Sequence, residues 1–467
     1  MSGLYSSLNT TVKALNAQSR GIDLSGRNLA NVNNPAYARQ RVILGDRGTV
    51  VTPDGAQSLG LEALGVQQLR DSLLDRQVTR EVSLKAAFAA EQQAYQRAQA
   101  GLGQGIDAIT ATGGAATGLG AALNDFFNSF QGLASRPTDS GERQTLLQKA
   151  AILTDRLRLT DSRLDQVQTD LDAQIASDVD SINGLLQSIA ELNAQIHRTE
   201  INRPGGAADL RDQRQARIEE LSAKLPVEVR PGAGGQVQLV MKDAANADVL
   251  LVDGPNVTGP VAFTGTGLTA GAGATPVVFA TGSIAGALTA RDGAVQDLRD
   301  RLDQLARQMV TAVNAAYNPG GTPGADFFDP AGLTAGTIAL RAGLDANTLV
   351  AGAGGAGDNS IALAVAAVAA QRFSTAGGDV IDGTLSQFYS TTVSSLGQSL
   401  ASANTRVEDQ NRIEQLVRAQ RDSVSGVNLD EEMAELLRYQ RAFQASSRVF
   451  NVIDDLLDTV VNRLGTM

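Results

Sequence analysis

The chain has 467 residues, 43% of them apolar, which is enough for two or three domains with cores of their own. Its 39 Lys and Arg stand against 50 Asp and Glu, for a net charge of -11. An acidic chain repels phosphate backbones, so nucleic acid is excluded as a partner. The chain has no cysteine, which excludes disulfides, thiolate metal sites and thiol nucleophiles.

A long amphipathic helix is predicted at the N-terminus. Its apolar residues recur at every seventh position, the spacing of a coiled-coil face: Leu8, Leu15, Ile22 and Leu29. We expect the helix to end near Asn31 and Pro35, because asparagine favours turns and proline cannot continue a helix. Residues 1–40 are therefore predicted to form one helix of a stalk domain. They contain no apolar run typical of a cleaved signal peptide.

A helical body is predicted on either side of a β-rich insertion. Its first part, residues 41–230, contains helices predicted at about 64–100, 140–200 and 207–225. Its second part, residues 285–427, contains a heptad helix from Leu288 to Met309 and a final segment at about 384–425. The Gly-rich stretch 320–358 is predicted as loop or short strands.

Residues 231–284 have the pattern of strands and turns. Short apolar runs, such as Val237 to Met241 and Val249 to Val252, are separated by Gly, Pro and Asn, which is typical of a small β-rich domain. We expect this insertion domain to project from the helical body and to join it at two neighbouring points.

The C-terminus, residues 428–467, repeats the heptad pattern of the N-terminus. Apolar residues fall at every seventh position: Leu429, Leu436, Phe443, Phe450, Leu457 and Leu464. Met433 lies in the first turn, and Asn428 is placed to cap the helix. We predict that this helix packs antiparallel against the N-terminal helix. Val449, Val452 and Leu456 widen its apolar face beyond what one neighbour can cover.

The predicted fold is therefore mainly α. It is an elongated, discontinuous helical bundle with paired N- and C-terminal coiled-coil helices and a small β-rich insertion domain. The longest apolar run, Ile361 to Ala370, is shorter than the roughly 20 residues that a membrane span needs, so we expect no membrane insertion.

No enzymatic site is predicted. His197 is the only histidine and is expected on the polar side of a long helix. One histidine and no cysteine exclude metal clusters built on those residues. No lysine follows a glycine, so a phosphate-binding P-loop is absent as well. We therefore predict no catalytic residue, no metal site and no cofactor.

Several stretches resemble one known family. After the first predicted helix the chain reads Ala30-Asn-Val-Asn-Asn-Pro-Ala-Tyr-Ala-Arg39. This is similar to Ala-Asn-x-x-Thr-Pro-Gly-Tyr-x-Arg, the signature of the axial proteins of the bacterial flagellum (rod, hook and hook-associated proteins). Asn34 and Ala36 stand where Thr and Gly are usual. Near the C-terminus, Gly426-Val-Asn-Leu-Asp-Glu-Glu-Met433 and Tyr439-Gln-Arg-Ala-Phe443 resemble the hook–filament junction members of that family.

The resemblance implies a structural adaptor exported unfolded through the flagellar type III apparatus, without a cleaved signal peptide, to the extracellular hook–filament junction. Its implied partners are the hook protein, the second hook–filament junction protein, neighbouring copies in a ring, and an export chaperone on the C-terminal helix. The assembly interface would comprise the heptad residues of both terminal helices together with Asn31, Pro35, Tyr37 and Met433.

Two alternatives remain open at this stage. The first is another axial protein, such as the hook protein or the second junction protein. The second is a secreted coiled-coil adhesin or effector whose β-rich insertion is the binding head. Heptad patterns at both ends favour assembly, because an adhesin needs only one anchored end.

Overall fold

The computed structural model describes residues 2–459 apart from 47, 53–54, 59, 104–117, 202–204 and 356. These residues are mainly helical, with small antiparallel sheets between the helices, which confirms the predicted fold class. They form two compact units. The first comprises residues 1–85, 179–282 and 410–467, and the second comprises 86–178 and 283–409. Three helices contribute residues to both units: α2 (Ser72–Gly101), α5 (Ser140–Glu200) and α10 (Leu385–Ser425).

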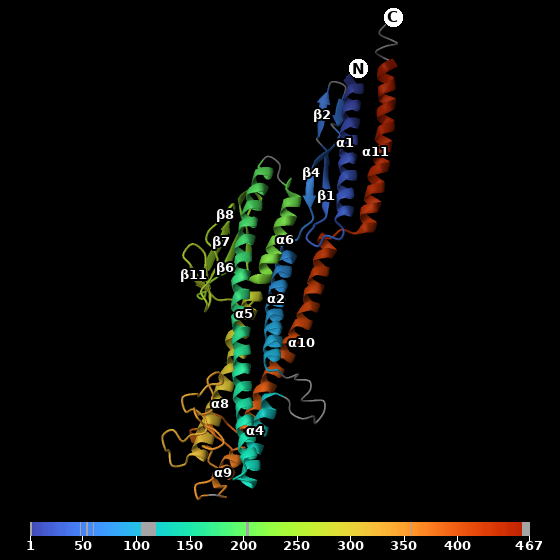
Figure 1. The fold of residues 1–467 in the computed structure, drawn as a ribbon. Coiled ribbons are helices and arrows are strands. Elements are labelled where there is room, and N and C mark those ends of the chain that lie inside the picture. Colours follow the sequence, from blue (N-terminus) through green and yellow to red (C-terminus); the bar gives the residue numbers. More distant parts are fainter. Residues whose placement is uncertain are drawn as a thin grey trace. The chain divides into compact units, whose positions relative to one another are not determined.

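The first unit contains both terminal helices, α1 (Ser2–Ala30) and α11 (Leu429–Asp458). The two helices pack against each other, and Figure 1 shows them antiparallel, with both chain ends at the same end of the pair. This confirms the predicted pairing. The predicted cap is also present, since Asn428 Oδ1 accepts the backbone N–H of Asp430 at 3.0 Å.

A β-hairpin follows α1, and here one prediction is wrong. Strand β1 (Gln40–Asp46) pairs antiparallel with β4 (Leu61–Gln68), and the short strands β2 (Thr49–Thr52) and β3 (Gly55–Ser58) pair between them. The helix predicted from residue 64 therefore begins only at Ser72. Gly65 disfavours helix, and the strand is stabilised by a partner far earlier in the chain, which local periodicity does not reveal.

Helix α6 (Ala208–Lys224) leads into the β-rich stretch, whose strands form two antiparallel sheets. The larger sheet has the order β5-β6-β7-β8, from β5 (Glu228–Pro231), β6 (Val237–Lys242), β7 (Asp248–Asp253) and β8 (Asn256–Val257). The smaller has the order β11-β10-β9, from β9 (Ala262–Phe263), β10 (Leu268–Ala270) and β11 (Thr275–Val277). The predicted strand character of this stretch is confirmed.

Side chains of α5 bond directly to this β-rich stretch. Asn193 is fully buried, and its Nδ2 donates to the carbonyl oxygens of Val237 at 3.0 Å and Gly254 at 2.7 Å. Asn183 both donates to Val261 O and accepts from Val261 N, each at 2.9 Å. His197 also faces this stretch, since a Cβ added at Gly234 would lie 2.3 Å from its Nδ1. His197 is half-buried, so the polar side of the helix on which we expected it is covered in part by this stretch.

The second unit contains α4 (Leu119–Ser135), α7 (Ser283–Ala290), α8 (Gln296–Tyr317) and α9 (Ser360–Val368). The helix predicted from Leu288 to Met309 is interrupted by a π-helical segment, Arg291–Val295, in which Gly293 has the non-helical angles φ -96° and ψ -105°. The Gly-rich stretch 320–358 also belongs to the second unit. Its described residues form turns and bends and one isolated β-bridge, between Phe328 and Leu340.

An aromatic cluster forms the core of the second unit. Phe126 and Phe130 of α4 meet Phe327 and Phe328, with ring centroids 5.0–5.8 Å apart. All four rings are fully buried. Edge-on and tilted ring contacts of this kind add to the stabilisation that comes from burial alone.

Candidate assembly interface

A buried stripe runs along α1, which packs against α11, β1 and β4. In this stripe Ala17 and Asn28 are each 1% exposed and Leu24 is 6% exposed. At Gly21 the helices α1 and α11 approach so closely that an added Cβ would lie 2.6 Å from the ring of Tyr439. The missing side chain at Gly21 thus lets α11 come close to α1.

The predicted heptad residues lie on and beside this contact. On α1, the four predicted apolar residues are half-buried: Leu8, Leu15, Ile22 and Leu29. On α11, Leu457 is buried, Leu436 and Phe450 are half-buried, and Phe443 is exposed. Leu464 lies outside the described residues.

Six exposed apolar side chains of α11, together called the α11 line, form two groups of three, one in the first turns of the helix and one near its end. Its six members are 47–58% exposed: Leu429, Met433, Leu437, Val449, Val452 and Leu456. An apolar surface of this length along a single helix marks a site where another chain can dock. The first unit by itself leaves this line in water.

A buried polar cluster joins the end of α1 to the start of α11. Tyr37 Oη donates to Asn28 Oδ1 at 2.8 Å, and Asn28 Nδ2 donates to Glu432 Oε2 at 3.0 Å and to Gln40 O at 2.9 Å. The backbone N–H of Gln40 donates to Asn28 Oδ1 at 3.1 Å. Asn28 thereby holds one helix, one strand and the partner helix in a single register, and its position was not predicted.

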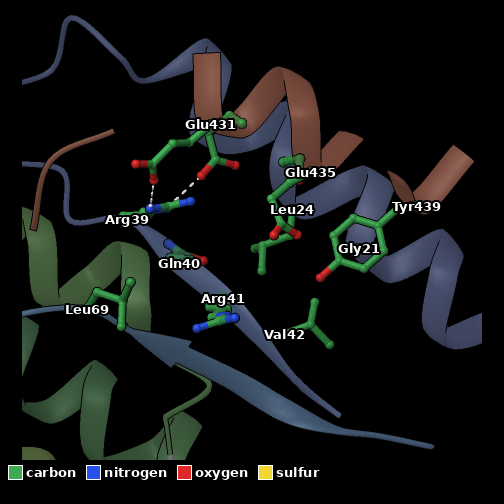
Figure 2. A pocket seen from close by; sticks show the side chains of 12 residues that line it. Gly21, Leu24, Arg39, Gln40, Arg41, Val42, Leu69, Glu431, Glu435 and Tyr439 are labelled. Carbon is green, nitrogen blue, oxygen red and sulfur yellow. Dashed lines mark hydrogen bonds and ion pairs between the residues drawn. The ribbon is translucent and has the colours of Figure 1, made fainter. Parts of the chain in front are cut away.

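Arg39, which directly precedes β1, completes this junction. Its Nε donates to Glu432 Oε1 and its Nη1 to Glu431 Oε2, each at 2.6 Å. Figure 2 shows the guanidinium beneath the first turn of α11, with the Tyr439 ring beside Gly21 across the same pocket. The bond to Glu432, whose side chain is 3% exposed, is shielded from water, and such a bond to a charged partner contributes about 1.5–3 kcal/mol. The bond to Glu431, whose side chain is 58% exposed, adds little. The Glu432 contact therefore helps to fix where α11 begins.

The three turn residues predicted from the sequence each make a different contact near the end of α1. Asn31 Nδ2 donates to Arg27 O at 2.9 Å, which closes the last turn of α1. Pro35 is exposed, but its carbonyl oxygen accepts from Arg421 Nη2 at 2.8 Å. Tyr37 is buried, and burial together with Asp209, Asp212 and Glu432 raises the pKa of its hydroxyl.

Asp212 of α6 is a residue of this junction that sequence reasoning missed. Its Oδ1 accepts from Arg70 Nη2 and Gln68 Nε2, both at 2.6 Å, and from the backbone N–H of Ala38 at 3.3 Å. Burial outweighs these partners and raises the pKa of its carboxyl to about 6. The heptad patterns gave no signal for it, because the residue lies on the inner face of a separate helix.

Within the described ranges, we find no group of three or more His, Cys, Asp or Glu side chains that could hold a metal ion. No helix in the described part of the chain is both long and apolar enough to cross a bilayer. The geometry of the interface is that of a packing surface, with apolar lines and buried ion pairs.

Two family descriptions match this chain. Residues 104–328 match "Flagellar hook-associated protein FlgK helical domain", and residues 418–464 match "Flagellar basal body rod FlgEFG protein C-terminal". The second match includes all of the described part of α11.

Whole-length relatives agree with these matches. The chain is 25% identical to flagellar hook-associated protein 1 of Bacillus subtilis, over 100% of this chain and 99% of the relative. It is also 25% identical to the protein of the same name from Escherichia coli, over 98% of this chain and 100% of the relative. A solved structure, the flagellar hook junction protein FlgK from Burkholderia pseudomallei, aligns with a TM-score of 0.45 at 21% identity, over 54% of this chain and 46% of that one.

Proposed function

This chain belongs to the family of flagellar hook-associated protein 1, and from that membership we propose that it is a structural adaptor at the junction between hook and filament. In this proposal the pair α1–α11 is the part through which each copy enters the assembly. The β-rich stretch and the second unit lie outside that contact.

The exposed apolar line on α11 carries this proposal. Full burial of a Val or Leu side chain contributes about 1.5–3 kcal/mol. The members of the line are about half exposed in the free chain, so each has roughly half of that still to gain. A neighbouring copy in a ring, the hook protein and the second junction protein are the partners that we propose for this surface.

The exposed apolar residues of α11 also bear on how the chain is exported. We propose that the chain is exported unfolded through the flagellar type III apparatus and that a chaperone covers the α11 segment beforehand. An apolar helix face left in water is a hazard for aggregation, which supports the need for such a cover. The absence of cysteine is compatible with passage to an oxidising exterior.

The alternatives from the sequence receive less support. The match over residues 104–328 is to a helical domain described for FlgK, which favours the junction protein over the hook protein. An adhesin with a projecting β-rich head is disfavoured, since Asn183 and Asn193 bond that stretch directly to α5.

The decisive variant is Val452→Asp. Val452 is 58% exposed, so a carboxylate there is tolerated in the free chain but is desolvated when a partner covers the line. We expect the purified variant to keep its helical content and melting temperature. Cells that carry it in place of the natural chain should have hooks without filaments in electron micrographs, and should not swim.

Asn451→Asp is the matched control, because it adds the same charge at the neighbouring exposed position, outside the apolar line. This control should assemble filaments at the normal frequency. Normal filaments in the Val452→Asp cells would show that the α11 line is not an assembly surface.

A further inference from the structure

One cleft of the first unit has a chemistry that assembly through α1 and α11 does not use. It has a volume of about 520 Å³ and lies among β1, β4, the start of α2, α6 and the larger sheet. Arg70, Arg211 and Arg214 all line it, and none of its lining residues in the described part of the chain is Asp or Glu. Three cations lining one cleft is unexpected in a chain whose net charge is -11.

Two of these arginines are already neutralised. Arg70 is paired with Asp75 and Asp212, and Arg211 is paired with Glu200. Arg214 forms no ion pair with any residue that the structure describes. Its Nη1 donates only to neutral acceptors, Asn193 Oδ1 and Gly235 O, both at 2.8 Å.

Although it has no ion-pair partner among the described residues, Arg214 is buried, with only 8% of its surface exposed. A buried cation without a directly bonded counter-ion is costly, because it has lost water. The charge of nearby Glu200, which is already paired with Arg211, offsets that cost only in part. Burial and the neighbouring Arg211 accordingly lower the pKa of its guanidinium to about 10. A bound anion would offset that cost.

The guanidinium also has donors to spare. Arginine carries five N–H donors, and the bonds to Asn193 and Gly235 use only Nη1. Neither Nε nor Nη2 of Arg214 is among the buried polar atoms that lack a partner. Both nitrogens therefore keep some contact with solvent, and the solvent that Arg214 borders includes this cleft, where the fork geometry of a guanidinium suits a carboxylate.

We propose that this cleft binds a carboxylate, with Arg214 as its principal ligand and the side chain of an Asp or Glu on a neighbouring polypeptide as its source. The apolar walls favour a peptide, since Ile43, Val66 and Ile218 line the cleft beside the arginines. An acidic residue flanked by apolar ones matches both surfaces.

The test uses the full chain and follows the amide chemical shifts of Gly235 and Val237 while succinate is added at constant ionic strength. We expect saturable shifts with succinate and none with an equal ionic strength of chloride. Arg214→Gln should weaken succinate binding tenfold or more, because it removes a charged hydrogen-bond donor. Arg217→Gln is the matched control, because Arg217 lies on the same helix but pairs with Glu220 outside the cleft, and it should bind as the natural chain does.

A second variant keeps the test decisive if Arg214→Gln does not fold. Ile43 is 43% exposed and lines the cleft, so Ile43→Glu places a carboxylate there without removing Arg214. It should abolish the response to succinate. Equal responses to succinate and chloride, or an undiminished response in Ile43→Glu, would overturn the proposal.

The source of the carboxylate is decided with acetyl-Leu-Asp-Leu-amide. Binding of this tripeptide at least tenfold tighter than succinate supports a polypeptide source, because only the peptide fills the apolar walls. Tripeptide binding no tighter than succinate would overturn the assignment to a polypeptide, and would leave a free dicarboxylate as the ligand of the site.

Discussion

The terminal helix pair and the aromatic cluster of the second unit differ in what lines their contacts. In the pair, Gly21 lets the two helices approach closely, and a polar cluster around Asn28 joins the end of α1 to the start of α11. In the second unit, Phe126, Phe130 and their partners fill the interior with large rings, all of them fully buried. The pair leaves a line of apolar side chains on α11 in water, whereas the aromatic cluster leaves none of its rings exposed.

This difference separates stability from assembly. A core closed on itself has gained its burial within one chain, so its strength does not depend on neighbours. A helix pair that covers one face of α11 has part of its stabilisation still to gain from another chain. We therefore expect damage to the aromatic cluster to unfold the chain, and small changes in the pair to alter how its helices dock.

The largest effect is expected from Phe126→Ala. Loss of a fully buried ring leaves a cavity, which costs about 3–5 kcal/mol in the free energy of unfolding. Urea unfolding followed by circular dichroism measures it. Leu363→Ala, at a position that is 52% exposed in the same unit, should change the free energy of unfolding by less than about 0.5 kcal/mol. Similar losses in the two variants would contradict the idea of a closed aromatic core.

A smaller effect is expected from Gly21→Ala. The added Cβ would lie 2.6 Å from the Tyr439 ring, so the helices must separate, at a cost of about 1–3 kcal/mol. Hydrogen exchange of the α11 amides around Tyr439 should become faster. Gly26→Ala, on the same helix with no atom within 4 Å of the added Cβ, should leave exchange unchanged or slow it, since Ala favours helix by about 1 kcal/mol. Equal exchange rates in both variants would place the close approach elsewhere.

The smallest effect is a dependence on pH. In the folded chain the pKa of the Asp212 carboxyl is about 6, above its ordinary value of 3.8. The folded chain therefore binds this proton more tightly than the unfolded chain does. Its stabilising contribution is complete below the lower value and is lost as the pH rises through about 6. Between pH 7 and pH 5 the natural chain should gain about 1 kcal/mol of stability from this group.

Asp212→Asn isolates that contribution, since the amide does not titrate. The difference in urea midpoint between pH 7 and pH 5, measured for both chains, reports it. The variant should gain less stability than the natural chain as the pH falls. Parallel changes in the two chains would show that Asp212 is not the group responsible.

Local pattern determined most of the helices. The helix predicted at about 140–200 corresponds to α5, and the predicted cap at Asn428 begins α11, since helix periodicity and capping are properties of neighbouring residues. The short strands β6 and β7 were predicted for the same reason, from apolar runs bounded by turn residues. The family was also recognisable from the sequence, because the turn after α1 and the start of α11 carry compact motifs.

The tertiary structure decided what depends on distant partners. Strand β4 forms because β1 lies beside it, and no periodicity within Leu61–Gln68 records that pairing. A close approach in the terminal pair lies at Gly21, because the approach of two backbones selects small side chains, whereas a search for heptads selects large ones. The buried roles of Asn28, Asp212 and Arg214 arise where separate elements converge, and a polar residue becomes informative only when its buried partners are known.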